Sequence, residues 1–277
     1  MIRESDIERI EINLLLEAIF NRYGYDFRHY AKASIKRRIK NLLRKNNIKY
    51  ISELIPEILH NESFFEQNVY DFSITVTEMF RDPGFYKSLK EDIIPYLKTY
   101  PFIKVWHVGC ATGEEVYSFA IFLKEAGLDK KTTIYATDFN EEALKTAKEG
   151  IYSLEAVKKF TANYQKAGGQ HTFSDYYHAK YKSAIINQNL KANITFANHN
   201  LVTDGIFGEM HLIFCRNVLI YFDKNLQNRV LRLLDESIIR KGFLALGSKE
   251  SLSFTAIENK YNITDGKNKI YQKKNEF

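Results

Sequence analysis

The sequence predicts two parts, a small helical domain followed by an α/β domain whose sheet is mostly parallel. Before Pro101, apolar side chains recur at helical spacing. After Pro101, short apolar runs alternate with helical stretches, which is typical of a parallel sheet covered by helices on both faces. Residues 151–193 interrupt this alternation with a polar, Tyr-rich stretch, which we expect to form a small antiparallel β insert.

Length and composition fit this organisation. With 277 residues and 45% apolar side chains, the chain can bury one large core and a smaller companion. It contains no run of about 18 apolar residues, so we expect no membrane-spanning helix. Acids lie within residues 1–6, where a signal peptide would be apolar, and two cysteines do not suggest a disulfide framework. We therefore expect a reducing, cytoplasmic location.

Four helices are expected in the N-terminal domain, residues 1–72. Asp6 is expected to cap the first helix. Its apolar side chains at helical spacing are Ile10, Leu14, Leu15, Ile19 and Phe20. The other three helices cover about residues 31–45, 51–60 and 61–69. Residues 73–100 are expected to form a linker and a connecting helix that begins near Pro83.

The C-terminal domain, residues 101–277, supplies the alternating elements. The expected strands are residues 103–108, 133–137, 194–196, 211–215 and 243–246. The expected helices are residues 114–126, 140–148 and 224–239, with residues 153–166 helical inside the insert and 171–186 forming its antiparallel part. In such a sheet, ligands bind beyond the carboxyl ends of the strands, near the switch in strand order.

A glycine-rich turn, Val108-Gly109-Cys110-Ala111-Thr112-Gly113-Glu114-Glu115, follows the first expected strand and opens a helix. Its two glycines let the backbone turn tightly and approach a ligand, and the helix start supplies free N–H groups. The spacing differs from the G-x-G-x-x-G of dinucleotide sites, and two adjacent carboxylates would repel a diphosphate. They favour a cationic cofactor without phosphate, such as S-adenosylmethionine. The alternative is a plain turn whose acids suit the helix dipole.

Two further segments follow expected strands. Asp138 ends the second strand, where a carboxylate can accept both ribose hydroxyls of a cofactor. The alternative for Asp138 is a helix N-cap. Residues 214–222 leave another strand and place Arg216, Asn217 and Tyr221 near the same edge. From the pattern alone, functional and packing roles are both open for these three, and residues 73–82 look like a mere linker.

The second expected helix is strongly cationic on one side. Nine Lys or Arg residues and no Asp or Glu lie between Arg28 and Lys49. Arg37, Lys40 and Arg44 recur at i, i+3 and i+7, away from the apolar stripe. Three interpretations stand side by side: docking of an acidic partner, a solvated helix face, or contact with nucleic acid.

Five strings, taken together, carry a family resemblance. They are Thr75-Val76-Thr77-Glu78-Met79-Phe80-Arg81, Thr112-Gly113-Glu114-Glu115-Val116-Tyr117-Ser118, Ala136-Thr137-Asp138, Cys215-Arg216-Asn217-Val218-Leu219-Ile220-Tyr221-Phe222 and Gly247-Ser248-Lys249-Glu250-Ser251. In order and separation they resemble the chemotaxis receptor methyltransferases, the CheR family, over nearly the whole chain. The sequence departs from the family at Thr75, where many members have Asn, at Met79, where Phe is usual, and in the last string, which is G-H-S-E-S in the family.

The resemblance implies a Rossmann-like class I methyltransferase domain, with residues 151–193 as the family's β insert. In some members this insert docks a peptide at the receptor's C-terminus, but the insert here has no strong match. The implied reaction moves a methyl group from S-adenosylmethionine to glutamate side chains of chemoreceptor cytoplasmic helices, giving glutamate methyl esters and S-adenosylhomocysteine. By motif match, the cofactor-binding residues are Thr75, Thr77, Arg81, Gly109, Glu115, Asp138, Asn200, Leu201, Arg216 and Asn217. Tyr221 would lie near the methyl group.

This chemistry needs no general base, because a glutamate with a pKa of about 4.3 is ionised at about pH 7. Arg81 and Tyr221 are therefore expected to act by orienting the acceptor carboxylate. Receptor helices are acidic, so the face of Arg37, Lys40 and Arg44 is expected to dock them, and nucleic acid is not the expected partner. No metal is expected, because the histidines show no metal-ligand spacing: His107, His199 and His211.

Two alternatives to this function come from different classes. The first is a methyltransferase that acts on another protein, on RNA or on a small molecule. The second is a non-catalytic regulatory module that binds S-adenosylmethionine or another nucleotide. The nature of the product separates the first, since an ester is labile in base and an N-methyl group is not. A turnover assay separates the second alternative, because a non-catalytic module binds the cofactor without transferring a methyl group.

Overall fold

The structure, a computed structural model, describes residues 3–73 and 75–275. The chain divides into two compact units. The helical unit comprises Met1–Ile74 and Ile220–Arg229, and the sheet unit comprises Thr75–Leu219 and Val230–Phe277. From Thr75 on, the segment expected to link the domains is thus part of the sheet unit. In the part of the chain that the structure describes, no helix is long and apolar enough to cross a membrane.

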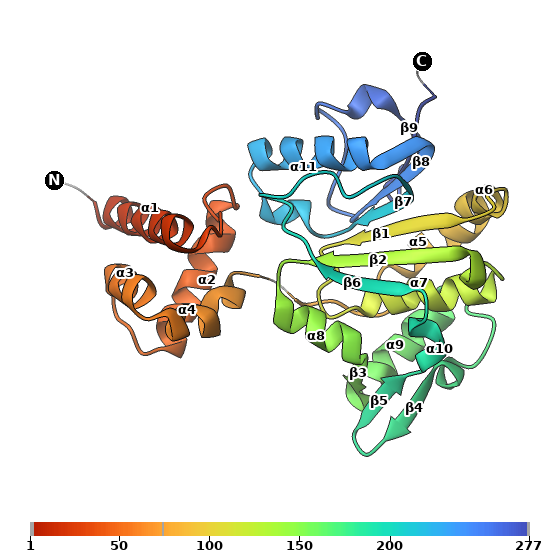
Figure 1. The fold of residues 1–277 in the computed structure, drawn as a ribbon, viewed down its shortest axis with the longest axis horizontal. Coiled ribbons are helices and arrows are strands. Elements are labelled where there is room, and N and C mark those ends of the chain that lie inside the picture. The colour runs from red at the N-terminus through yellow and green to blue at the C-terminus, as the bar shows by residue number, and fades with distance from the viewer. Residues whose placement is uncertain (1–2, 74, 276–277) are drawn as a thin grey trace. The chain divides into compact units, whose positions relative to one another are not determined.

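Within residues 3–73, four helices form the helical unit, close to the positions that the sequence predicts (Figure 1). They are α1 (Glu4–Tyr23), α2 (Lys32–Lys45), α3 (Ile51–His60) and α4 (Glu62–Asn68), followed by the 3₁₀ turn η1 (Val69–Phe72). Their apolar faces meet in a small core that includes Leu15, Ile19, Ile39, Leu54 and Phe72. Helix α1 ends where Gly24 turns left-handed at φ 79° and donates its N–H to the Phe20 carbonyl.

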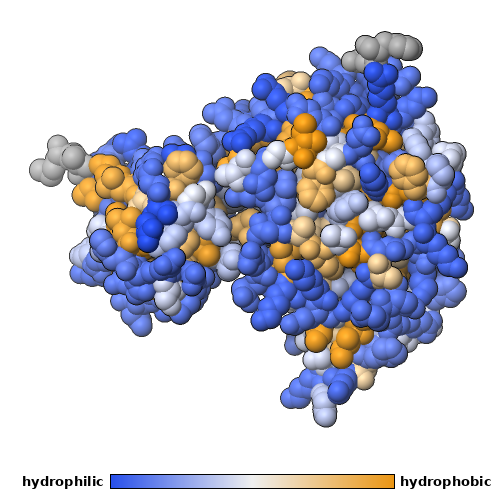
Figure 2. Space-filling view, in the orientation of Figure 1, coloured by the Kyte–Doolittle hydropathy of each residue, from blue (hydrophilic) through white to orange (hydrophobic). Residues whose placement is uncertain are grey.

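The predicted start of α1 is wrong. The N-cap position is Arg3, which makes no side-chain cap, and Asp6 lies inside the first turn, where it pairs with Arg3. The expected apolar stripe also divides between core and surface. Leu15 and Ile19 are buried, whereas Ile10 and Leu14 are 47% and 55% exposed. Figure 2 shows apolar side chains at the surface of this unit.

The sheet unit contains a seven-stranded sheet in the order β6-β2-β1-β7-β8-β10-β9. The first five of these are parallel, as predicted: β6 (Ile194–Asn198), β2 (Thr132–Asp138), β1 (Ile103–Val108), β7 (Met210–Cys215) and β8 (Ile238–Leu246). Strands β1 and β7 are almost wholly buried, which explains their continuous apolar sequence. The predicted α/β class with a mostly parallel sheet is confirmed.

Two strands at one edge of the sheet were not predicted. They are β9 (Tyr261–Asp265) and β10 (Ile270–Lys273), and both run antiparallel to their neighbours. Three of the five β9 residues are exposed, so this edge strand lacks the apolar run that marks the central strands. Because its sequence is polar, the pattern of apolar residues does not predict β9 as a strand.

Helices lie in front of and behind the strands in Figure 1. They are α5 (Pro83–Ser88), the π-helical turn η2 (Leu89–Ile93), α6 (Ile94–Lys98), α7 (Glu114–Glu125), α8 (Glu141–Glu149), α10 (Gln188–Lys191) and α11 (Lys224–Ser237). The connecting helix expected to begin near Pro83 is therefore the run α5–η2–α6. Short 3₁₀ turns are η3 (Asp129–Lys131), η5 (Leu219–Tyr221) and η6 (Glu258–Lys260).

The predicted antiparallel insert is confirmed as a three-stranded sheet in the order β3-β5-β4. It consists of β3 (Ile151–Ser153), α9 (Leu154–Lys166), η4 (Phe173–Tyr176), β4 (Tyr177–Lys180) and β5 (Ser183–Ile186). Glu125, the last residue of α7, accepts hydrogen bonds from the hydroxyls of Tyr164 and Tyr176. This carboxylate ties the insert to the end of α7.

Candidate active site

The carboxyl ends of β1, β2 and β7 meet at one edge of the sheet. Parallel pairing sets Val108 opposite Thr137, and so brings Gly109 beside Asp138. Strand β1 has β2 on one side and β7 on the other, so the strand order switches here. Crevices at such a switch are the usual ligand sites of parallel sheets.

The glycine-rich turn requires glycine at Gly109 for two reasons. Its φ of 64° is left-handed, and a Cβ would lie 2.7 Å from Val218 Cγ2. Gly113 is left-handed too, and a Cβ there would lie 3.2 Å from the Ala147 backbone. Between them even Ala111 is left-handed, at φ 49°. The turn thus holds its backbone close against neighbouring segments.

Asp138 holds this turn from the next strand. Its Oδ2 accepts the N–H of Ala111 at 2.9 Å, and its Oδ1 accepts the N–H of Asn140 at 3.0 Å. The cap of α8 is Asn140, whose side chain accepts the N–H of Ala143, so Asp138 is not the N-cap. Burial raises the pKa of Asp138, while these backbone donors oppose the rise. A carboxylate has about four acceptor positions, which leaves room for ribose hydroxyls.

A partly buried ion cluster adjoins the turn, and the side chains of Glu115 and Asp82 in it are 18% and 40% exposed. The Arg216 side chain is 2% exposed and donates to Glu115 Oε2 at 2.6 Å and to Asp82 Oδ2 at 2.7 Å. Its guanidinium also lies 4.1 Å from the centre of the Phe85 ring. Burial by itself would raise the pKa of Glu115, but Arg216 and His107 together outweigh it and hold that pKa below its usual value. Two carboxylates and one guanidinium leave the cluster with a net negative charge.

The segment that looks like a linker forms part of this site. Phe80 and Asp82 are left-handed at φ 53° and 55°, and the Phe80 N–H donates to Ser118 Oγ at 2.9 Å on α7. Asp82 belongs to the ion cluster. Arg81, between them, is half-buried and makes no hydrogen bond or ion pair within residues 3–73 and 75–275. Thr75 and Thr77 are also half-buried.

Asn217 is positioned by Glu250, a residue for which the sequence predicts no role. Glu250, 5% exposed, accepts the backbone N–H of Asn217 at 2.9 Å and that of Gly247 at 2.6 Å. These bonds hold Asn217 left-handed at φ 62°. A Cβ at Gly247 would lie 2.7 Å from the Asn217 nitrogen, so the two segments touch through their backbones. The string 247–251 contributes to the family resemblance in the sequence, but it does not indicate that Glu250 positions Asn217.

The remaining predicted residues divide between the units. Asn200 and Leu201 follow β6, where the N–H of His199 donates to the Asp138 carbonyl at 3.2 Å. Tyr221 belongs to the helical unit, where its carbonyl accepts the Ala31 N–H at 2.8 Å and the Arg38 guanidinium lies 5.6 Å from its ring centre. Within the described residues, no three His, Cys, Asp or Glu side chains gather as metal ligands.

The cationic face on α2 is present in the helical unit. Arg37, Lys40 and Arg44 are all exposed. Glu8 lies 3.5 Å from Lys40 and also contacts Lys36, so Lys40 is partly neutralised. Arg38, in contrast, is buried at 5% exposure and faces inward. The free positive charge of the face therefore belongs mainly to Arg37 and Arg44.

Comparison with known proteins gives matches over both units. The family model described as "CheR methyltransferase, SAM binding domain" matches residues 75–270, and "CheR methyltransferase, all-alpha domain" matches residues 10–72. A Cher3 protein of Pseudomonas putida is 48% identical over 95% of this chain and 97% of its own length. A chemotaxis protein methyltransferase of Borreliella burgdorferi is 26% identical over 89% of this chain and 90% of its own. The solved N-methyltransferase NodS of Bradyrhizobium japonicum, with S-adenosylhomocysteine, aligns over 76% of this chain and 71% of its own at 13% identity and a TM-score of 0.35.

Proposed function

The chain belongs to the CheR family of S-adenosylmethionine-dependent methyltransferases, and on this premise we propose that it methylates glutamate side chains on chemoreceptor cytoplasmic helices. The products would be a glutamate methyl ester and S-adenosylhomocysteine, as in chemotactic adaptation. The chemotaxis protein methyltransferases among its relatives support this acceptor. The reaction would take place in the cytoplasm, where these receptor helices lie.

The observation that carries the proposal is the partly buried cluster of Arg216, Glu115 and Asp82 beside the glycine-rich turn. Its net negative charge favours a cation and disfavours a diphosphate. S-adenosylmethionine brings a sulfonium and an ammonium group and no phosphate. The residues present therefore fit this cofactor.

The cofactor site proposed here combines five segments of the sheet unit. Asp138 would accept the ribose hydroxyls with the acceptor positions that the turn leaves free. The other residues proposed to hold the cofactor are Thr75, Thr77, Arg81, Gly109, Glu115, Asn200, Leu201, Arg216 and Asn217. Glu115 and Arg216 would act as one charged pair, because each fixes the position of the other.

Orientation is the catalytic task left to the protein. When bound, S-adenosylmethionine supplies an electrophilic methyl group, which an ionised carboxylate accepts without a general base. Arg81 is suited to orient that carboxylate, because its guanidinium has no partner among the described residues and is half-buried. Tyr221 is the second proposed orienting residue, and its hydroxyl would donate to the same carboxylate.

The helical unit would bring the acceptor to the site. Arg37 and Arg44 present unshared positive charge, which suits the acidic surface of receptor helices. Such a contact would speed encounter more than it would strengthen the final complex.

The proposal is tested by incubating the protein with methyl-labelled S-adenosylmethionine and purified chemoreceptor. We expect label on the receptor that is released in mild base, because methyl esters hydrolyse there. Arg81→Ala and Tyr221→Phe should each slow labelling, and Lys145→Ala on α8 serves as a distant control. Base-stable label would point to another acceptor. Binding of S-adenosylhomocysteine without any turnover would point to a regulatory module.

A further inference from the structure

Helix α9 of the insert contacts the segment that leads into Arg81. The side-chain amide of Asn163 donates a hydrogen bond to the Met79 carbonyl at 3.0 Å. One helical turn earlier, Lys159 forms an ion pair with Glu78. Residues four positions apart lie on the same face of a helix, so one face of α9 meets two successive residues of this segment.

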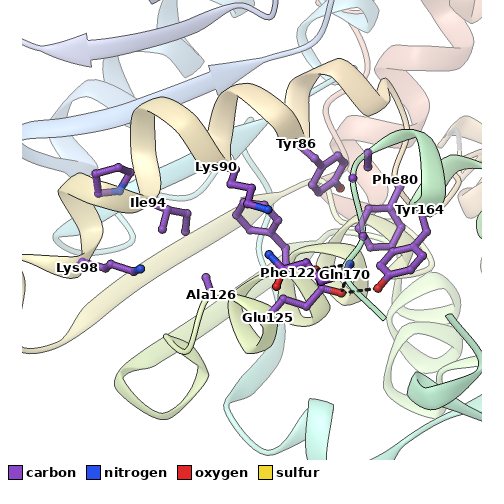
Figure 3. A pocket seen from close by; sticks show the side chains of 14 residues that line it. Phe80, Tyr86, Lys90, Ile94, Lys98, Phe122, Glu125, Ala126, Tyr164 and Gln170 are labelled. Carbon is purple, nitrogen blue, oxygen red and sulfur yellow. Dashed lines mark hydrogen bonds between the residues drawn. The ribbon is translucent and has the colours of Figure 1, made fainter. Parts of the chain in front are cut away.

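Aromatic packing extends the same contact by one residue. The ring centres of Phe80 and of Tyr164 on α9 are 5.1 Å apart, in edge-to-face geometry (Figure 3). The Tyr164 hydroxyl donates to Glu125 at the end of α7, so the position of this ring is fixed from its other end as well. Helix α9 therefore contacts three consecutive residues, 78–80.

The hydrogen bond from Asn163 is the contact on which this segment depends most. Met79 is fully buried, and no described residue other than Asn163 donates to its carbonyl. A buried carbonyl without a donor is costly. The ion pair is different, because the Lys159 side chain is 68% exposed and exposed ion pairs contribute little.

The backbone on both sides of Arg81 is strained. Phe80 and Asp82 are left-handed, at φ 53° and 55°. Such conformations persist only where the surrounding structure fixes them, and they cluster at functional sites. Ser118 accepts the Phe80 N–H, and Arg216 binds the Asp82 carboxylate. The direction of the Arg81 side chain is thus set by neighbours that are themselves held in place.

One peptide unit in this segment is held from two helices. The Met79 carbonyl and the Phe80 N–H belong to the same peptide unit, which is planar. Asn163 on α9 binds its carbonyl, and Ser118 on α7 binds its N–H. Because the plane of this unit sets the direction in which the chain continues into Arg81, both hydrogen bonds are needed to orient that residue.

We propose that Asn163 is a positioning residue for methyl transfer, which fixes the Met79–Phe80 peptide unit and so directs Arg81 toward the acceptor carboxylate. This role rests on the proposed function, in which Arg81 orients that carboxylate. The insert then takes part in the reaction through α9, although none of its residues touches the reacting atoms.

The test is receptor methylation by Asn163→Ala, with rates normalised to the folded fraction from Trp106 fluorescence. We expect kcat to fall about tenfold, because a small displacement of an orienting group slows transfer strongly. KM for the receptor should not change, since the proposed docking face lies on α2. Gln165→Ala is the matched control and should keep the kcat of the unaltered chain. Gln165 carries the same amide on the same helix, is exposed, and its side chain makes no hydrogen bond with a described residue.

A double-mutant cycle distinguishes positioning from a merely structural role. If Asn163 acts through Arg81, Asn163→Ala should cause no further loss of kcat in an Arg81→Ala background. An additive loss would overturn the proposal, as would an unchanged kcat in Asn163→Ala or an equal loss in Gln165→Ala. Asn163→Asp keeps the size of the side chain and lacks the donor, so it serves as the second variant if Asn163→Ala does not fold.

The proposed function and the role of Asn163 fail in different ways. No receptor labelling by the unaltered chain would refute the proposed function itself. Base-labile labelling by the unaltered chain, together with an unchanged kcat in Asn163→Ala and Asn163→Asp, would overturn only the role of Asn163.

Discussion

Gly109→Ala tests the glycine-rich turn most directly. The new methyl group meets two penalties, a left-handed backbone at φ 64° and a Val218 Cγ2 atom at 2.7 Å. The first costs about 1–2 kcal/mol for a non-glycine residue, and overpacking costs about 1–3 kcal/mol. We therefore expect the free energy of unfolding of the sheet unit to fall by about 2–5 kcal/mol.

A matched control separates the two penalties. Gly127 has nearly the same backbone, φ 68°, in the same unit, but no atom lies within 4 Å of its Cβ position. Gly127→Ala should therefore cost only the backbone penalty, about 1–2 kcal/mol. Val218→Ala should relieve the contact at Gly109, so that Gly109→Ala in that background costs no more than Gly127→Ala.

The assay is urea denaturation followed by the fluorescence of Trp106. It is the single tryptophan of the chain and is fully buried in β1, so it reports on the sheet unit. The reasoning is refuted if Gly109→Ala costs no more than Gly127→Ala, or if Val218→Ala gives no relief.

Three other perturbations follow from contacts described above. Arg216→Ala should destabilise the sheet unit by about 3–5 kcal/mol in the same assay, because Glu115 is left buried without its partner; a loss under about 1 kcal/mol would contradict this. Hydrogen bonds from Ser88 and Asn268 outweigh burial and lower the pKa of Asp265 from 3.8 to about 2. Its carboxylate therefore stabilises the fold above pH 3.8, and this contribution is lost as the pH falls toward about 2. Asp265→Asn should therefore reduce acid destabilisation in that window, and an unchanged acid titration of Trp106 fluorescence would speak against it. Arg37→Glu/Arg44→Glu should slow receptor methylation, more at low than at high salt. Lys40→Glu should slow it less, because Glu8 already shares the charge of Lys40. Equal effects of the two variants would contradict the proposal that this face docks the receptor.

Local sequence predicted the central strands, where both faces are buried, and missed the polar edge strand β9. Strands β1 and β7 have continuous apolar sequences because both faces are covered, whereas β9 alternates with polar residues at the edge. The misplaced start of α1 has a similar cause. Asp6 is a good capping residue, but the helix extends one turn earlier and uses Asp6 in its first turn.

The site was predictable one residue at a time, but not as a constellation. Gly109 and Asp138 could be named because each follows a strand that the sequence marks. The pairing of Arg216 with Glu115 and Asp82 joins positions 101 and 134 residues apart, and only the fold brings them together. Glu250 is a further case, since its two backbone donors become visible only when Asn217 and Gly247 are adjacent.

Helix α7 joins features that the chain keeps far apart. Its 12 residues span about 18 Å, since each residue of an α-helix rises by about 1.5 Å. Near its N-terminus, Glu115 accepts a hydrogen bond from Arg216. At its C-terminus, Glu125 accepts hydrogen bonds from two tyrosines of the insert. One continuous, largely buried helix therefore connects the insert to the ion cluster. The insert and the ion cluster thus contact opposite ends of the same helix.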